Sequence, residues 1–291
     1  MQFANPFQTP GRWLKSNFHT HTTASDGDRP LSERAAQYRE KGYNVLAVTD
    51  HEKTNDVAGL SAGDFLVMSG METHPACPGA VEYHLVCLNV PHGLQFAASV
   101  EPNERIRKVR ELGGEVIIAH PYWCGHNLNH LLALTGAVGV EVFNATCTKI
   151  GKGISSVQWD DLLDAGRILP ASACDDTHGG RDIFMGWTMI KAQSLTVAAV
   201  MEALRSGCYY SSCGPVIEDF AVKDGLATVR CSPAAEIHFI SRRYRGGSFY
   251  ADDGPDLVRA QFPIAEADRY LRVEVVDRRG NRAWTNPLML S

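Results

Sequence analysis

The sequence NFHTHTTASDG, residues 17–27, places two histidines and an aspartate within eight positions. These residues, His19, His21 and Asp26, are all potential ligands of a metal ion. In an extended strand, residues i and i+2 point to the same side, so both imidazoles can face one ion at the end of a strand. The His-x-His pair alone is a weak signal, because 11 histidines in 291 residues give roughly 0.4 such pairs by chance. Whether the pair binds a metal ion must therefore be judged from other potential ligands in the chain.

Short runs rich in β-forming residues alternate with helix-like segments over the first two thirds of the chain. This alternation predicts an α/β fold with a parallel sheet closed as a (β/α) barrel, and an open doubly wound sheet is the alternative. The helix-like segments end at glycines such as Gly42 and Gly113, as helices commonly do. The predicted strands are 16–21, 44–49, 64–69, 83–90, 115–119, 138–143, 168–173 and 187–191, and the predicted helices are 31–41, 102–112, 154–165 and 196–205.

The pattern changes after Gly214. Short alternating strands follow one another there, separated by turn pairs such as Asp224-Gly225 and Asp253-Gly254, without helical periodicity between them. This pattern predicts two domains: a large barrel at residues 1–213 and a small, all-β, sandwich-like domain at residues 214–291.

Composition excludes several classes of protein. A hydrophobic content of 44% supports a full core, and a net charge of −5 argues against general binding of nucleic acids. Residues 116–140 contain no Asp, Glu, Lys or Arg, but histidine, proline and asparagine interrupt this stretch too often for a membrane helix, and the opening residues lack the pattern of a secretory signal. Eight cysteines without a C-x-x-C pair indicate reduced thiols. We expect a cytoplasmic protein without membrane contact, and its oligomeric state is left open.

An acidic residue or a histidine lies at or near the carboxyl end of nearly every predicted strand. In a (β/α) barrel these ends meet at the face where active sites are built. Each residue alone has an ordinary explanation, such as a helix cap or a buried histidine, but such explanations do not account for the shared placement. His74 and four further histidines fit the pattern less well. The sequence therefore predicts a metal centre, and the residues that follow or lie in the later strands are Asp50, His51, Glu72, His84, His120, Asp176 and His178.

The ordered motifs HTHTTASDG, VLAVTDHE, SGMETH, EYHLVCLNV, IIAHP and ACDDTHGG resemble those of the PHP family, the polymerase and histidinol phosphatase superfamily of metal-dependent hydrolases. The resemblance covers roughly residues 13–213. It implies a distorted (β/α)₇ TIM-like barrel with two or three divalent ions, which would be zinc, manganese or iron. Since some relatives carry histidine where this chain has Asp26, one site is expected to be weaker or to prefer a harder ion. The implied ligand groups are His19, His21, Glu72 and Asp176; Glu72, His84 and His120; and Asp26, His51 and His178.

Two ions bridged by a carboxylate can activate a water molecule and polarise the bond that it attacks. We therefore predict a phosphoesterase that uses a metal-activated water on a small phosphorylated metabolite or nucleotide. The tail segment GPVIEDFAVKDGLATVRCSPAAEIHFI resembles the β-domain of the carbaryl-hydrolase-like branch, so a carboxyl-ester or carbamate hydrolase is the alternative. A noncatalytic metal-binding interaction module is a third hypothesis. The predicted catalytic residues are Glu72, His120, Asp176 and His178.

Further residues are expected to support the reaction. Arg181 and Lys149 are candidate clamps for the phosphate of a small anionic substrate, and Asn144 is a candidate contact to that substrate. Asp50 and Asp175 are expected to accept hydrogen bonds from the second ring nitrogens of ligating imidazoles, because such imidazoles usually need an acceptor there.

Overall fold

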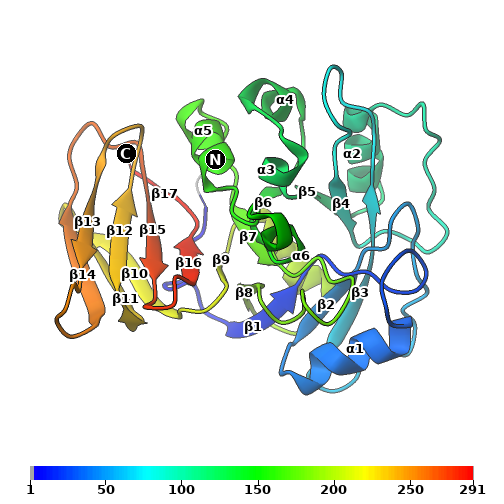
Figure 1. The fold of residues 1–291 in the computed structure, drawn as a ribbon, viewed down its shortest axis with the longest axis horizontal. Coiled ribbons are helices and arrows are strands. Elements are labelled where there is room, and N and C mark those ends of the chain that lie inside the picture. The colour runs from blue at the N-terminus through cyan, green and yellow to red at the C-terminus, as the bar shows by residue number, and fades with distance from the viewer. Residues whose placement is uncertain (1–2, 291) are drawn as a thin grey trace.

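The computed structural model describes residues 3–290 and contains a 14-stranded sheet with a three-stranded sheet beside it (Figure 1). The strand order along the large sheet is β13-β12-β15-β16-β9-β8-β1-β2-β3-β4-β5-β6-β7, and β17 pairs with β15. The α/β class predicted from the sequence is confirmed.

The first part of the large sheet is mixed rather than parallel throughout. Parallel pairing joins β1 to β2, β2 to β3, β5 to β6 and β6 to β7, whereas β4 is antiparallel to both of its neighbours and β8 is antiparallel to β1 and β9. The strands are β1 (Arg12–Asn17), β2 (Val45–Val48), β3 (Leu66–Thr73), β4 (Leu85–Leu88), β5 (Glu115–Ile118), β6 (Gly139–Asn144), β7 (Ala171–Cys174), β8 (Trp187–Ala192) and β9 (Tyr209–Ser212).

All eight strands predicted in this region are present, with ends shifted by up to four residues. The expected regular alternation with helices is wrong at β3 and β4, because no helix precedes either strand. An antiparallel neighbour needs no crossover helix, so β4 can follow β3 through a simple loop. A single parallel bridge between Thr20 and Thr177 joins the segments that follow β1 and β7. The described residues thus approach a barrel there without forming a continuous closing ladder.

Four of the helices confirm the predictions, with ends within two residues of those expected. Pro102 begins one of them at a position where its missing N–H costs nothing, and the Thr196 side chain accepts a hydrogen bond from the Ala199 N–H at the start of another. The short helices α3, α4 and η1 were not predicted. The helices are α1 (Leu31–Glu40), α2 (Pro102–Glu111), α3 (Pro121–Cys124), α4 (Leu128–Ala133), η1 (Thr146–Ile150), α5 (Ser156–Asp164) and α6 (Val197–Arg205).

All elements after β9 in the described chain are strands, and they lie together at one end of the molecule (Figure 1, yellow to red). β16 pairs with β9, so the large sheet continues across the expected boundary at residue 213. The division into two domains stays a prediction. The strands are β10 (Ile217–Lys223), β11 (Leu226–Ala234), β12 (Glu236–Ile240), β13 (Gly246–Tyr250), β14 (Leu257–Pro263), β15 (Tyr270–Val276), β16 (Arg282–Thr285) and β17 (Leu288–Met289), of which β10, β11 and β14 form the smaller sheet.

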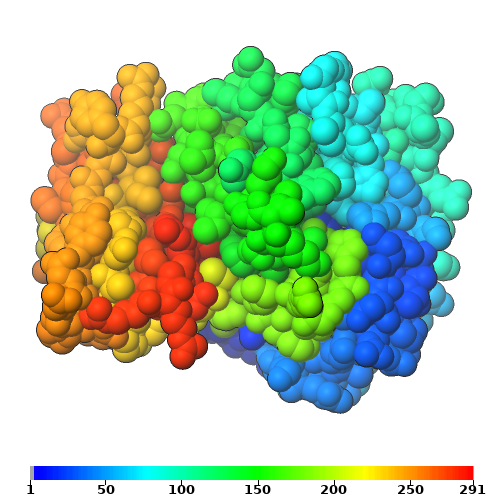
Figure 2. All heavy atoms as spheres, viewed as in Figure 1, coloured from blue at the N-terminus to red at the C-terminus, as the bar shows by residue number. Residues whose placement is uncertain are grey.

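The C-terminal strands pack closely on the earlier part of the chain (Figure 2). The buried guanidinium of Arg272 donates hydrogen bonds of 2.8 and 2.6 Å to Asp160 of α5 and lies over the Trp159 ring. Asn286 accepts a hydrogen bond from the Ala171 N–H of β7 at 2.8 Å. These contacts fix the strand that leads to Asp176.

Among the described residues, no helix combines the length and the apolar character that spanning a membrane requires.

Candidate metal centre

The structure brings all nine predicted metal ligands together around one carboxylate. They come from loops and strand ends along β1, β2, β3, β4, β5 and β7, and most of them line a pocket of about 240 Å³. Because β4 runs against its neighbours, its first end lies beside the carboxyl ends of the parallel strands, and His84 stands directly before it. The nine residues are His19, His21, Asp26, His51, Glu72, His84, His120, Asp176 and His178.

Glu72 lies at the centre of this arrangement and is buried. Its Oε1 lies 2.8 Å from Nδ1 of His84 and 3.2 Å from Nε2 of His120. Its Oε2 lies 2.9 Å from Nδ1 of His51 and 3.3 Å from Nε2 of His19. Burial alone would raise the pKa of Glu72, but His19 and the other imidazoles lower it well below its usual range. The carboxylate therefore stays ionised and can bridge two cations.

The most enclosed group consists of His19, His21, Glu72 and Asp176, all of them buried. The Oδ1 atom of Asp176 lies 2.9 Å from Nε2 of His21 and 3.3 Å from Nε2 of His19. Nε2 of His19 and Oε2 of Glu72 are buried without a hydrogen-bond partner among the described residues. Buried polar atoms normally find partners. These unpartnered atoms, an imidazole nitrogen and a carboxylate oxygen 3.3 Å apart, are placed to bind one cation together.

The second nitrogen of His19 has a fixed partner. Its Nδ1 lies 2.7 Å from Oε1 of Glu141, which is buried in β6. Because an ionised carboxylate can only accept, Nδ1 is the donor and Nε2 is directed to the group. Burial lowers the pKa of His19, but the carboxylates of Asp176, Glu72 and Glu141 outweigh it and raise that pKa well above its ordinary value. In the absence of a cation, this imidazole therefore carries a proton that a metal ion would replace.

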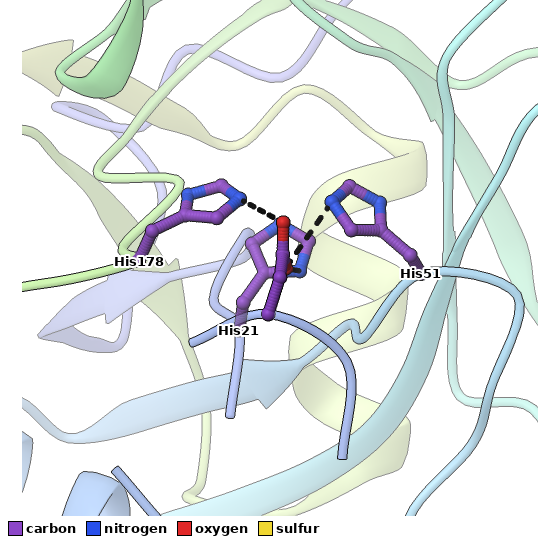
Figure 3. A group of neighbouring side chains, drawn as sticks. His21, His51 and His178 are labelled. Atoms are coloured by element: carbon purple, nitrogen blue, oxygen red, sulfur yellow. Dashed lines mark ion pairs between the residues drawn. The ribbon is translucent and has the colours of Figure 1, made fainter. Parts of the chain in front are cut away.

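The outer group consists of His21, Asp26, His51 and His178 (Figure 3). The two Asp26 oxygens lie 3.4 Å from Nε2 of His51 and 3.4 Å from Nε2 of His178. The Asp26 side chain is 54% exposed, so this group opens toward solvent. Nδ1 of His178 lies 2.8 Å from the carbonyl oxygen of Asp176 and must donate to it. Nε2 of His178 is then the ring nitrogen directed to Asp26 and available to an ion.

Two of the nine residues have a strained backbone. His120 has φ of 22° and Asp176 has φ of 55°, in a region that non-glycine residues rarely adopt. Such strain costs about 1–3 kcal/mol per residue and persists only where neighbours hold it. The His120 N–H donates to Glu141 at 2.9 Å, and the Asp176 N–H donates to the His19 carbonyl at 2.9 Å. Backbone hydrogen bonds thus fix both side chains toward Glu72.

Glu141 is the supporting residue that the sequence analysis missed. Besides His19 and the backbone of His120, it accepts a hydrogen bond from Nδ2 of Asn144 at 3.0 Å. A single acid inside the apolar run VGVEVF was the available signal, because a buried carboxylate in a strand requires donors.

We expect Glu141→Gln to weaken metal binding by about tenfold while the protein stays folded, since loss of such an outer partner typically costs 10–100-fold in metal affinity. Competition with a chelating dye measures the affinity. Glu115→Gln is the matched control, because Glu115 is also buried but starts β5 and pairs with Arg205 away from the pocket. Equal affinities in Glu141→Gln and the unmodified protein would contradict the assignment.

The expected roles of Asp50 and Asp175 need correction. Asp50 accepts hydrogen bonds from the backbone and hydroxyl groups of Thr22 and Ser25, and so shapes the loop that carries Asp26. Asp175 accepts from Tyr38 and from three successive backbone N–H groups at residues 184–186. Neither carboxylate has a hydrogen bond to an imidazole among the described contacts. Both hold loops, because unpaired backbone N–H groups near the pocket also need acceptors.

The three predicted substrate contacts lie in different settings. Asn144 donates a hydrogen bond to Oδ2 of Asp176 at 3.1 Å, so its amide supports that carboxylate. Lys149 is half-exposed and pairs with the buried Asp182 at 2.5 Å. Arg181 is exposed on the loop after β7. None of the three lines the pocket, and their contact with a substrate stays a prediction.

No protein-family model and no curated protein matches the sequence. Among solved structures, the chain is similar to a two-domain protein from Bacteroides vulgatus that contains a predicted PHP-like metal-dependent phosphoesterase, at 14% identity over 99% of this chain and 98% of that chain, with a TM-score of 0.55. An amidohydrolase from Chromobacterium violaceum matches at 16% identity over 57% of this chain and 89% of that chain, with a TM-score of 0.44. A lesion-specific endonuclease from Pyrococcus furiosus matches at 12% identity over 67% of this chain and 56% of that chain, with a TM-score of 0.43.

Only the first similarity bears on the fold, since the other two TM-scores are below 0.5. It extends over both the barrel-like part and the C-terminal strands. The chain therefore shares its fold with a protein that contains a predicted PHP-like metal-dependent phosphoesterase.

Proposed function

We propose that the protein is a metal-dependent hydrolase and that its substrate is a phosphate ester of a small molecule. The observation that carries this proposal is the buried carboxylate of Glu72, which stands between imidazoles on both of its oxygens. Oε2 of Glu72 and the facing Nε2 of His19 have no hydrogen-bond partner among the described residues. A mixed set of imidazole nitrogens and carboxylate oxygens suits zinc, manganese or iron.

The proposed ligands form three groups that share residues. Glu72 belongs to the first and second groups, and His21 can contribute to the first or the third. The groups are His19, His21, Glu72 and Asp176; Glu72, His84 and His120; and His21, Asp26, His51 and His178.

The chain's own residues prepare this site for hydrolysis. Divalent ions bound at neighbouring positions would lower the pKa of a water molecule and polarise the bond under attack. Glu72 and Asp176 keep their negative charge despite burial, because the surrounding imidazoles lower the pKa of each carboxyl group. His178 lines the pocket and its side chain is partly exposed, so its Nε2 would either bind the outer ion or contact a substrate that enters the pocket.

The volume of the pocket, about 240 Å³, suits a small substrate. Its lining is compatible with two classes of ester. Its described lining contains no lysine or arginine, so bound cations would have to attract a phosphate. The same lack of fixed positive charge favours the second candidate, hydrolysis of an uncharged carboxyl or carbamate ester. The expectation that the protein does not bind nucleic acids generally stays a prediction.

The two candidates can be separated with substrates that share one leaving group. Metal-free protein would be loaded with Zn²⁺, Mn²⁺ or Fe²⁺ and assayed with 4-nitrophenyl phosphate, 4-nitrophenyl acetate and 4-nitrophenyl N-methylcarbamate. We expect the phosphate to be hydrolysed, with turnover lost in chelator. Turnover of only the acetate or the carbamate would establish the second candidate. A fully metal-loaded protein that hydrolyses none of a broad ester panel would instead indicate the noncatalytic module.

A further inference from the structure

His74 lies beside Glu72 and His51 but belongs to none of the three proposed ligand groups. Glu72 lies in β3, and His74 directly follows the last residue of that strand, Thr73. Their side chains lie on the same side, with Nε2 of His74 3.6 Å from Oε2 of Glu72. His19 and His21 have the same i and i+2 spacing just after the end of β1. In the motif SGMETH, Glu72 and His74 are therefore spaced like the two histidines of the His-x-His pair.

The geometry directs His74 to two of the proposed ligands. Its Nε2 lies 3.1 Å from Nδ1 of His51 and 3.6 Å from Oε2 of Glu72. Nδ1 of His51 lies 2.9 Å from the same glutamate oxygen, so the three atoms form a compact triangle. That oxygen is the buried acceptor without a hydrogen-bond partner among the described residues.

A second carboxylate stands behind His74. Oε1 of Glu52 lies 3.9 Å from Nδ1 of His74 and accepts a hydrogen bond of 2.6 Å from the His74 backbone N–H. The buried guanidinium of Arg105 and the Thr73 hydroxyl hold Glu52 in place. Glu52 itself has a left-handed backbone, with φ of 52°. At 3.9 Å the Glu52 oxygen does not accept a hydrogen bond from Nδ1 of His74, but it holds the His74 backbone and places a negative charge beside the ring.

We propose that His74 is a further metal ligand, and that His51 Nδ1, Glu72 and His74 Nε2 form an additional position for a divalent transition-metal ion. This inference rests on the metal centre of the proposed function. The additional position also makes His51 a residue that two ions would share, because a neutral imidazole has only one nitrogen lone pair and can bind only one of them. His51 can face the inner position through Nδ1 or Asp26 through Nε2, and the two positions compete for its ring.

The test is to locate and count the bound ions, using the full chain loaded with Mn²⁺ or Zn²⁺. Anomalous diffraction should place a metal atom within bonding distance of Nε2 of His74. In solution, His74→Phe should bind one equivalent less metal after gel filtration, or hold its weakest equivalent with a Kd raised by at least about tenfold. His238→Phe is the matched control, because the His238 side chain is similarly enclosed (17% exposed against 21%) but lies on β12.

The outcomes separate this inference from the proposed function. Metal atoms at the other groups with none on His74, or unchanged metal content and affinity in His74→Phe, would overturn the inference and leave the proposed function intact. A protein that takes up no metal ion at all would overturn both. Loss of the equivalent in His74→Phe alone, with His238→Phe unchanged, supports the additional position.

Discussion

Glu72→Ala is expected to abolish metal binding at the shared positions and to lower kcat/KM by at least about a thousandfold. The reason is that both Glu72 oxygens face imidazoles, so one substitution removes a ligand from every group that contains this carboxylate. Bound ions supply several kcal/mol of transition-state stabilisation, and each 1.36 kcal/mol is a factor of ten in rate. Metal content by mass spectrometry and turnover of the preferred ester measure the two effects.

The fold should survive this substitution. Glu72 accepts from side chains of the centre rather than from the sheet, and its backbone pairing with Val86 of β4 does not depend on the side chain. Glu82→Ala, which removes an exposed glutamate in the loop before β4, is the control and should keep both metal and activity. If Glu72→Ala retained its full metal content and rate, Glu72 could not be the shared ligand.

The positions of the proposed ligands followed from the sequence because local rules determine them. The i and i+2 spacing of His19 and His21 fixes their common side, and an acid or imidazole after an apolar run marks a strand end. His84 is instructive, because it does not lie at the carboxyl end of its strand. It reaches the centre since β4 runs in the opposite direction. Hydrophobic periodicity contains no information on strand direction, so the sequence could not predict this.

Partners of buried carboxylates were harder to predict. Asp50, Glu141 and Asp175 are all buried acids near the centre, yet only Glu141 bonds an imidazole. The other two accept from loop groups that the sequence does not place in space. In the same way, pairing of β9 with β16 joins segments about seventy residues apart, and local patterns could not distinguish it from a separate domain.

Asp175→Ala is expected to lower the stability of the protein, whereas substitution of the neighbouring Asp176 is expected to remove metal ions. The Asp175 carboxylate accepts hydrogen bonds from the Tyr38 hydroxyl at 2.7 Å and from the N–H groups of Phe184, Met185 and Gly186 at 2.8 Å each. Burial raises the pKa of Asp175 to about 6, while these donors act against that rise. The group is therefore mostly ionised at neutral pH, and its two oxygens accept from four donors at once.

Removing this carboxylate leaves the three backbone N–H groups without their acceptor in the interior, while the Tyr38 hydroxyl keeps Thr177 Oγ1 as a partner at 2.6 Å. Each unsatisfied buried group costs about 1–3 kcal/mol, although water entering the space would recover part of it. We expect Asp175→Ala to lower the free energy of unfolding by about 3–5 kcal/mol, a large share of the 5–15 kcal/mol that is typical of folded proteins. Urea denaturation followed by tryptophan fluorescence measures this loss.

The adjacent residue provides the sharpest comparison. Asp176→Ala removes a proposed ligand that faces His19 and His21, so it should lose metal ions while keeping most of the stability of the metal-free protein. Asp175→Asn keeps one acceptor oxygen and should fall between Asp175→Ala and the unmodified chain in stability. If Asp175→Ala unfolded like the unmodified protein but lost its metal ions, this carboxylate would support the ligands instead of the loop. Two aspartates next to each other would then share one role, which their separate sets of partners argue against.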